Sequence, residues 1–224
     1  MILRYFAHAA FQITTNNGTR IVIDPWFDGN PLSPVKARDV SADYIIISHG
    51  HGDHCGDAQK IATPETTIVA VSELAGYFKE AGIKTHAMQI GGCHCFPFGR
   101  VCLTKAEHGS MTPDGRYAGL AAGIILTIDG KSIYHMGDTG LFGDIKLIKE
   151  RFDIDYLLIP IGGNYTMSPE DAVLAATWLK PGLVIPMHYN TFPLIKQDPL
   201  HFAKLCEAQG ILVNVMEPGS EISL

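Results

Sequence analysis

The segment His49-Gly50-His51-Gly52-Asp53-His54 places three of the ten histidines of the chain beside a carboxylate. Imidazole and carboxylate groups are ligands of divalent metal ions such as Zn²⁺. In an extended backbone, positions i and i+2 point the same way, so His49 and His51 can share one ion. Asp53 and His54 come after the chain turns and can serve a second ion. A polar loop is the alternative, but ordinary turns need Gly, Asn and Asp rather than three imidazoles.

Three further candidate ligands, His108, Asp138 and His188, each follow an apolar, strand-like run. Taken alone, each has an ordinary alternative. His108 and His188 could be polar residues at strand ends, and Asp138 in Gly-Asp-Thr-Gly could form an Asx turn. Taken together, they occur in the order implied by the resemblance described next, and this argues against the ordinary alternatives.

This order of ligands, HxHxDH followed by His, Asp and His, resembles the metallo-β-lactamase superfamily over nearly the whole chain. The segments 137–144, 160–167 and 186–191 resemble, more closely, a small group of metal-dependent hydrolases related to ascorbate-6-phosphate lactonases. The resemblance implies an α/β fold, a four-layer αββα sandwich with the metal site at one edge between two sheets. It implies a first metal on His49, His51 and His108, a second on Asp53, His54 and His188, and a bridging Asp138.

The resemblance also implies metal-assisted hydrolysis of an ester, lactone or phosphodiester bond of a small molecule. A hydroxide activated by two divalent ions would attack, with Asp53 and Asp138 as the catalytic carboxylates. Zinc is the expected metal, and manganese or iron would also suit these ligands. Two alternatives stay open: an iron-dependent oxidoreductase on the same fold, and a metal-binding protein without catalysis.

Several residues around the ligands are candidates for supporting roles. Asp24, which ends a strand before Pro25, can orient a ligand histidine or simply begin a turn. His8 lies between two strands and can reach the mouth of the site, although a plain surface or core histidine is the alternative. Four loop residues that can donate hydrogen bonds are candidate substrate contacts, with loop packing as the alternative: Asn164, Tyr165, Tyr189 and Asn190.

Composition predicts one folded domain over residues 1–224. Hydrophobic residues make up 46% and charged residues 18% of the chain, which argues against disorder. The net charge of −6 and the scattered Lys and Arg argue against nucleic-acid binding. No apolar run reaches the roughly 18 residues that a membrane span needs, and no signal peptide is evident. A homo-oligomer is compatible with the sequence.

The five cysteines, an odd number without a secretion signal, indicate reduced thiols and a cytoplasmic protein. Cys93-His94-Cys95 could contribute to a structural zinc site, but that would need a second ligand pair. A turn after Gly91-Gly92 is the favoured interpretation of this segment.

Hydrophobic periodicity and turn residues predict two similar halves. The first half is expected to hold strands at 2–5, 11–14, 20–24, 44–48 and 67–71, with helices at 57–62 and 73–81. The second is expected to hold strands at 101–106, 120–128, 132–136, 156–159, 183–187 and 212–217, with helices at 143–150, 169–179 and 199–209. Ser168, followed by Pro169 and two acidic residues, marks the start of one helix.

Overall fold

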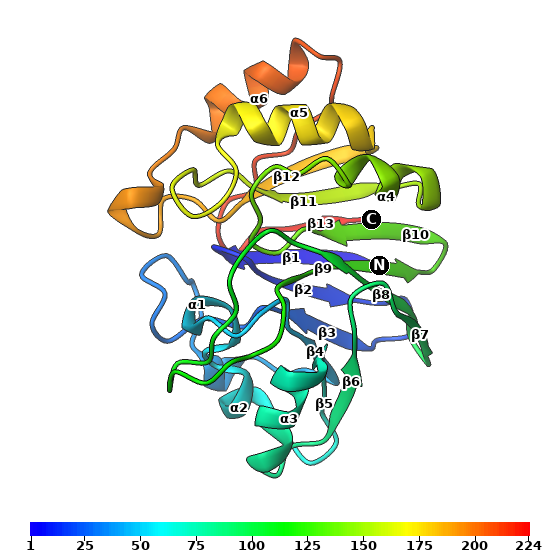
Figure 1. The fold of residues 1–224 in the computed structure, drawn as a ribbon, viewed down its shortest axis with the longest axis vertical. Coiled ribbons are helices and arrows are strands. Elements are labelled where there is room, and N and C mark those ends of the chain that lie inside the picture. The colour runs from blue at the N-terminus through cyan, green and yellow to red at the C-terminus, as the bar shows by residue number, and fades with distance from the viewer.

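Two mixed β-sheets pack face to face, and helices cover the outer face of each, as Figure 1 shows for residues 1–224 of a computed structural model. The α/β fold and its four layers confirm the architecture expected from the sequence. No helix is long and apolar enough to cross a membrane.

The first sheet has seven strands in the order β13-β1-β2-β3-β4-β5-β6. Strands β13, β1, β2 and β3 pair in antiparallel fashion, and β3 to β6 pair in parallel. The C-terminal strand β13 therefore returns to the N-terminal strand β1. The strands are β1 (Ile2–Ala7), β2 (Ala10–Thr14), β3 (Arg20–Ile23), β4 (Tyr44–Ile46), β5 (Thr67–Val71), β6 (Thr85–Met88) and β13 (Glu221–Ser223).

The second sheet repeats this plan with six strands in the order β12-β11-β10-β9-β8-β7. Strands β7 to β10 pair in antiparallel fashion, and β10, β11 and β12 pair in parallel. Each half of the chain thus begins with antiparallel strands and continues with parallel ones. The strands are β7 (Cys93–Phe96), β8 (Gly99–Lys105), β9 (Ala122–Ile128), β10 (Lys131–His135), β11 (Tyr156–Pro160) and β12 (Leu183–Met187).

The helices form the two outer layers. The first-half helices are α1 (Gly52–Cys55), α2 (Ala58–Ile61), α3 (Ser72–Glu80) and the short 3-10 helix η1 (Ala37–Asp39). The second-half helices are α4 (Ile145–Arg151), α5 (Pro169–Leu179), α6 (Pro199–Glu207) and the 3-10 helix η2 (Pro193–Ile195). Helix α5 starts as its sequence predicts, because the Ser168 side chain accepts a hydrogen bond from the Asp171 backbone N–H.

Alternating side chains of the central strands fill two separate cores. On β9, Ile124 and Leu126 pack between the two sheets, whereas Ile125 packs toward the helices of the second half. Strand β11 follows the same rule, with Leu158 facing the other sheet and Leu157 facing the helices. This alternation follows from the period of two in a β-strand. Both faces of the second sheet are therefore buried, and packing on both sides fixes the positions of its strands.

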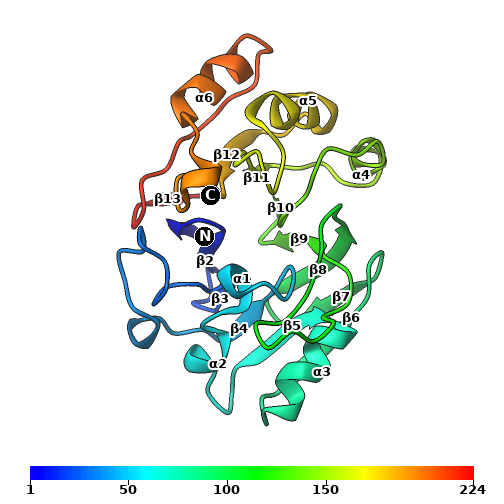
Figure 2. The ribbon, with the colours of Figure 1, turned by 60° about the vertical axis from the view of Figure 1, so that its left-hand side comes forward.

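The strands that lead into the predicted ligands share one direction within each sheet. In the first sheet β1 and β3 both run antiparallel to β2, and β4 runs parallel to β3. In the second sheet β8 and β10 both run antiparallel to β9, and β12 follows β10 through parallel pairing with β11. Helix α1 and the loop that carries η2 both lie at the end of the molecule where these strands stop (Figures 1 and 2).

Some expected elements differ from the structure. The predicted strand at 212–217 is a loop with a single bridge between Val184 and Val213, and the last strand is β13. Strands β6 and β7 were not predicted, because edge strands are half-exposed and lack the apolar pattern of buried ones. The short helix α1, inside the histidine-rich segment, was not predicted either.

The cysteines also require a correction. Cys93 forms a disulfide with Cys102, its directly paired residue on β8, and only Cys55, Cys95 and Cys206 are free. The expectation of five reduced thiols is therefore wrong. The turn expected after Gly91-Gly92 is instead strand β7, which brings the two sulfur atoms opposite each other. The pairing depends on strand register, which the spacing of the cysteines alone does not reveal.

Candidate metal centre

Three histidines from the first half and the middle of the chain form one compact group. His49 and His51 follow β4, and His108 follows β8. The Nδ1 atom of His51 lies 2.9 Å from Nε2 of His49 and 3.3 Å from Nε2 of His108. Two nitrogens bound to one tetrahedral zinc ion, at about 2.0–2.1 Å each, would stand about 3.3 Å apart. The three nitrogens therefore lie close to the spacing that a shared ion requires.

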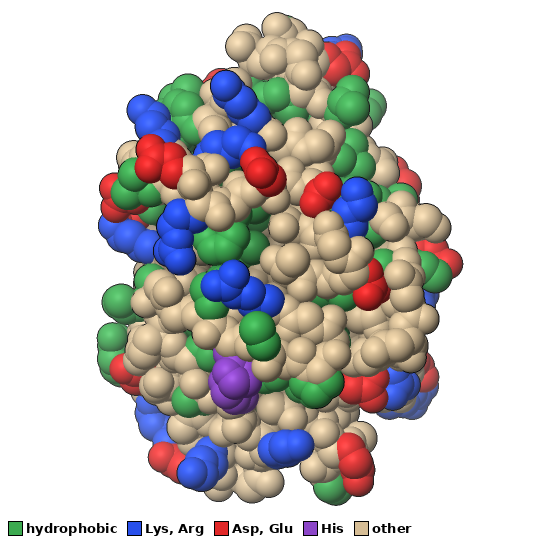
Figure 3. Space-filling view, turned by 90° about the vertical axis from the view of Figure 1, so that its right-hand side faces the viewer, with side chains coloured by type: hydrophobic (Ala, Val, Ile, Leu, Met, Phe, Trp, Pro, Cys, Tyr) green, Lys and Arg blue, Asp and Glu red, His purple; other side chains and the backbone are tan.

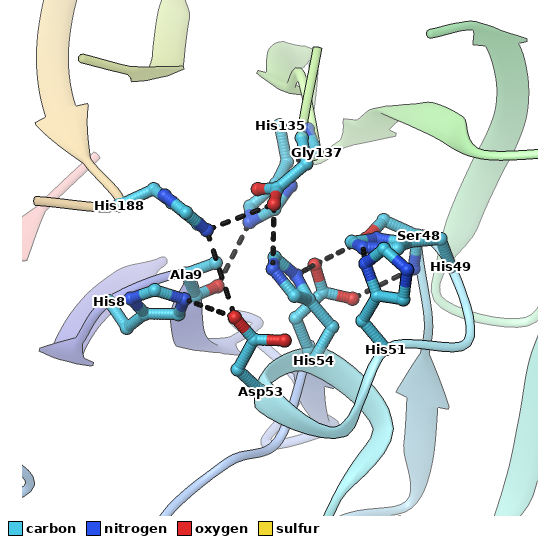
Figure 4. Close-up of polar contacts among 12 residues, drawn as sticks. His8, Ala9, Ser48, His49, His51, Asp53, His54, His135, Gly137 and His188 are labelled. Carbon is cyan, nitrogen blue, oxygen red and sulfur yellow. Dashed lines mark hydrogen bonds and ion pairs between the residues drawn. The ribbon is translucent and has the colours of Figure 1, made fainter. Parts of the chain in front are cut away.

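A second group surrounds Asp53 at the start of helix α1. Ligand atoms of Asp53, His54, His188 and His8 all lie within 4.8 Å of one another. His188 follows β12, and its Nε2 is 4.0 Å from Asp53 Oδ2. His8 follows β1, and its Nε2 is 3.2 Å from the same oxygen. Figure 4 shows these side chains pointing toward one another from both sheets.

Asp138, after β10, lies between the two groups. Its Oδ2 atom is 2.9 Å from His188 Nε2, 3.3 Å from His54 Nε2 and 3.5 Å from His108 Nε2. His108 belongs to the first group, and the other two histidines belong to the second. One carboxylate is thus within reach of both groups.

The buried atoms at the centre fit a bound cation. His54 Nε2, His188 Nε2 and Asp138 Oδ1 are buried and have no hydrogen-bond partner. Asp138 Oδ2 lies close to both imidazoles, yet neither approach meets the geometry of a hydrogen bond. Burying such groups without partners costs about 1–3 kcal/mol each. A divalent ion would satisfy them together, so the donor set suits a metal and explains why these atoms are otherwise unpaired.

Asp24 and Ser48 contact the Nδ1 atoms of His54 and His49, on the side of each ring away from Nε2. Asp24, fully buried at the end of β3, places Oδ2 2.8 Å from His54 Nδ1. The Ser48 backbone N–H and hydroxyl donate to Asp24 at 2.7 and 2.6 Å, and the Ser48 hydroxyl also lies 3.0 Å from His49 Nδ1. The carboxylate therefore fixes the orientation of His54 and leaves its Nε2 facing Asp138, which is the role a carboxylate serves behind a ligand histidine.

His8 supports the second group from the opposite side. Its ring is fully buried, with Nε2 toward Asp53 and Nδ1 2.9 Å from the Thr191 hydroxyl. Burial and the neighbouring His188 lower the pKa of His8 to about 4, so the ring is neutral at pH 7. The structure places His8 within the donor group itself, deeper than the mouth of the site.

Burial and the neighbouring charges set the protonation of the donors. Burial lowers the pKa values of His49, His51 and His108, which leaves their nitrogen lone pairs available. Burial opposes ionisation of Asp138, but His188 and His54 outweigh it and hold the Asp138 pKa well below its usual range. Burial likewise opposes charge on His54, yet Asp138 and Asp24 raise the pKa of His54. The same anionic environment would attract a metal cation.

Three residues of the site adopt left-handed backbone conformations. The φ angles are 59° at His8, 47° at Asp24 and 56° at His188. A residue with a Cβ atom pays about 1–2 kcal/mol for this conformation. Each of the three stands just after a strand, where the sharp turn directs its side chain toward the centre of the site. Strain of this kind concentrates at functional sites.

Comparison with known proteins agrees with this geometry. A sequence model of the beta-lactamase superfamily domain matches residues 2–188. A UPF0173 metal-dependent hydrolase from Geobacillus sp. strain WCH70 is 50% identical over the full length of both chains. The chain belongs to this family. A UPF0173 metal-dependent hydrolase from Bacillus cereus strain AH187 is 48% identical, again over both full lengths.

A solved structure gives the same assignment. Igni18, described as a novel metallo hydrolase from the archaeon Ignicoccus hospitalis, is 39% identical and superposes with a TM-score of 0.90, covering 99% of this chain and 97% of its own. The protein is therefore a metal-dependent hydrolase of the metallo-β-lactamase superfamily. This assignment favours hydrolysis over the oxidoreductase and non-catalytic alternatives.

A pocket of about 900 Å³ opens above the donors of this hydrolase. Of the four predicted substrate contacts, only Tyr165 lines it. Tyr189 is buried in the core of the second half, and Asn164 is exposed outside the pocket. Asn190 stabilises its own loop, because its Oδ1 accepts a hydrogen bond from the Gln197 backbone N–H at 2.8 Å. The expectation that these three residues line the pocket is corrected accordingly.

Sequence reasoning missed most of the pocket wall. Trp26, Phe192, Pro193 and Leu194 line it, together with Gly52 and five of the predicted ligands. The sequence did contain a pattern that could have predicted these wall residues. Trp26 stands two residues after Asp24, and the other three follow His188 within six positions. Apolar residues so close to ligands would have indicated the walls of the site. Ser48 was also missed, although it directly precedes His49.

Proposed function

We propose that this metal-dependent hydrolase uses two divalent ions to cleave an ester, lactone or phosphodiester bond of a small molecule. The observation that carries the proposal is the position of Asp138, whose carboxylate lies within 3.5 Å of histidines from both donor groups. Two cations about 3.5–4 Å apart repel each other, and a shared anionic ligand offsets that repulsion. A single-ion site would not need a carboxylate placed between two sets of donors.

In this proposal the first ion is held by His49, His51 and His108, and the second by Asp53, His54 and His188. When bound, the pair would supply an activated water as nucleophile and polarise the bond to be cleaved. The protein contributes position and charge. Asp24 fixes the His54 ring, His8 fixes Asp53, and Asp138 keeps its negative charge at the centre. Tyr165, half-exposed at the pocket wall, is placed to contact the substrate.

Metal stoichiometry tests the dinuclear part of the proposal. The purified protein should be stripped with a chelator, reconstituted separately with zinc, manganese and iron, and measured by elemental analysis. We expect about two equivalents per chain, with zinc as the best fit to the nitrogen-rich donors. Saturation at one equivalent would contradict the shared role of Asp138.

Isotope labelling tests the chemistry. The reconstituted protein should be assayed without oxygen on a panel of esters, lactones and phosphodiesters in ¹⁸O-labelled water. We expect turnover with zinc or manganese and label from water in the product. Turnover that needs iron and O₂, with label from O₂, would replace hydrolysis with oxidation.

A further inference from the structure

The pocket above the donors combines a polar floor with an apolar wall. His51, Asp53, His108, Asp138 and His188 form the floor. The wall is made of residues without formal charge: Trp26, Tyr165, Phe192, Pro193 and Leu194. Leu194 is 63% exposed and Tyr165 is 50% exposed, so much of this apolar surface faces the open pocket. Surface of this kind is stabilised when an apolar group covers it.

The aromatic rings of the wall, Trp26 and Phe192, are fixed in position by their packing. A side chain at Gly29 would come within 2.8 Å of the Trp26 indole nitrogen, and one at Gly56 within 3.2 Å of its Cδ1. Two glycines therefore keep open the slot in which the indole lies. The Phe192 ring packs against Trp26 with centroids 5.6 Å apart and planes at 32°.

His8 connects this wall to the donors below it. Its ring meets both aromatic rings edge-on, with centroid separations of 5.1 Å to Trp26 and 5.6 Å to Phe192. The same imidazole lies 3.2 Å from Asp53. The apolar wall thus has a fixed position relative to the reacting centre, as a surface that orients a substrate requires.

The wall carries no positive side chain. No Lys or Arg lines the pocket, although Arg and Lys are the usual partners of phosphate and carboxylate groups. Lys36, Arg38 and Lys60 lie instead along a separate hollow of about 410 Å³, where Lys60 pairs with Asp28 at 2.8 Å. A substrate with an anionic group remote from the cleaved bond would lose its hydration at the wall without gaining a partner.

We propose that the substrates are neutral carboxylic esters or lactones whose remote part is an aromatic ring or aliphatic chain, bound on the wall formed by Trp26, Phe192 and Leu194. This inference rests on the proposed hydrolytic function and narrows it. It disfavours phosphate-bearing lactones and phosphodiesters with charged remote groups. Covering one aromatic or leucine side chain should change affinity by tenfold or more.

Two matched esters test the substrate class. Methyl butyrate and monomethyl succinate share the methanol leaving group and the reacting ester, and differ only in a remote methyl group or carboxylate. With zinc-reconstituted enzyme, we expect kcat/KM, corrected for spontaneous hydrolysis, to be at least tenfold higher for the butyrate. Equal values, or preference for the succinate, would overturn the inference while leaving hydrolysis established.

A charge placed on the wall should shift this preference. Leu194→Lys introduces a cation at an exposed wall position, and Leu212→Lys makes the same change at a residue 67% exposed beside the far end of β12. We expect Leu194→Lys to reduce the butyrate-to-succinate ratio about tenfold, and Leu212→Lys to leave it unchanged. An unchanged ratio in Leu194→Lys would show that the wall does not contact the remote group.

Binding can be measured apart from catalysis. The chain has two tryptophans, and Trp178→Phe removes the one on α5, leaving Trp26 as the fluorescent reporter. Butyranilide, a neutral amide probe, should alter the Trp26 emission and compete with the butyrate ester, whereas succinanilic acid should bind at least tenfold more weakly. Phe192→Ala should weaken butyranilide binding about tenfold.

The outcomes separate the two proposals. Butyranilide binding without hydrolysis of any ester would remove the hydrolytic proposal and keep the apolar binding surface. Hydrolysis without a response of Trp26 emission to butyranilide would keep hydrolysis and remove the binding surface. If the protein neither binds butyranilide nor hydrolyses any ester, both the hydrolytic proposal and the apolar binding surface are overturned.

Discussion

Two histidine clusters lie in different parts of the molecule and differ in almost every physical respect. At the metal centre, imidazoles lie among carboxylates, and the Nε2 atoms of His54 and His188 are buried without hydrogen-bond partners. On the edge strands β6 and β7, His86 and His94 also lie close, with ring centroids 4.2 Å apart. His94 is exposed there, and both rings contact Phe96. Figure 3 shows one face of the molecule, on which a histidine is exposed among hydrophobic and basic side chains.

The comparison shows that close imidazoles alone do not indicate a metal site. Burial and the neighbouring His94 lower the pKa of His86, and no carboxylate or thiol completes a group of three donors with this pair. The metal centre instead receives donors from the ends of strands in both sheets and from helix α1, and these donors include the carboxylates of Asp53 and Asp138. Two features therefore distinguish the metal centre from the His86–His94 cluster: several strand ends converge on it, and it contains negatively charged carboxylates.

Removal of the central carboxylate should have the largest effect. In the proposed two-ion site, Asp138→Ala would leave the cations without their shared anion, so we expect kcat to fall at least about 10³-fold, equivalent to about 4 kcal/mol, with loss of roughly one metal equivalent. Steady-state kinetics and elemental analysis measure both. His94→Ala is the matched control and should retain both values. Wild-type activity in Asp138→Ala would remove the basis for distinguishing the clusters.

The metal-free protein should lose stability as the pH falls. The folded pKa of His8 is about 4, below its ordinary value of 6.5, so the unfolded chain binds the proton first. This contribution is complete above pH 6.5 and declines by up to about 3 kcal/mol toward pH 4. The raised pKa of His54 acts in the opposite sense, with a contribution that is lost as the pH rises.

Urea unfolding of the chelated protein at several pH values measures this dependence. His8→Gln should flatten the decline between pH 6.5 and 4, whereas His201→Gln, an exposed histidine on α6, should leave it unchanged. An identical decline in His8→Gln would assign the effect to other buried histidines.

Loss of the carboxylate behind His54 should have a smaller effect. Asp24→Asn keeps the size of the side chain and removes its charge, so we expect metal affinity to fall about 10–100-fold. Competition with a chromophoric chelator measures it. Asp153→Asn, at a side chain that is 98% exposed, is the control and should bind metal as the wild type does. Unchanged affinity in Asp24→Asn would mean that the His54 ring is oriented by packing alone.

The smallest effect is expected at the second cluster. His86→Ala and His94→Ala should leave the metal content unchanged and alter the free energy of unfolding by about 0.5 kcal/mol or less, because both positions lie on edge strands. Elemental analysis and urea unfolding measure these values. Loss of a metal equivalent in either variant would give this cluster a binding role of its own.

The donors were accessible from sequence because each follows a buried strand within a few residues or lies in helix α1, the first element after β4. An apolar run in the sequence marks such a strand, so the residues that follow it can be identified from the local sequence alone. The wall residues required knowledge of loop conformation. Tyr189 adjoins His188, yet successive residues here point in different directions and the tyrosine enters the core. Edge strands β6 and β7 and the disulfide between Cys93 and Cys102 depend on pairing register, which no local pattern specifies.

The return of β13 to β1 bears on how the chain is made. Residues 2–4 pair with residues 221–223, so β1 is synthesised more than 200 residues before the strand that covers its edge. During synthesis one side of β1 offers unpaired backbone groups to any neighbouring chain. The second sheet contains only strands from residues 93–187 and can close earlier. Nascent copies can therefore associate through the open edge of β1 until β13 has been made.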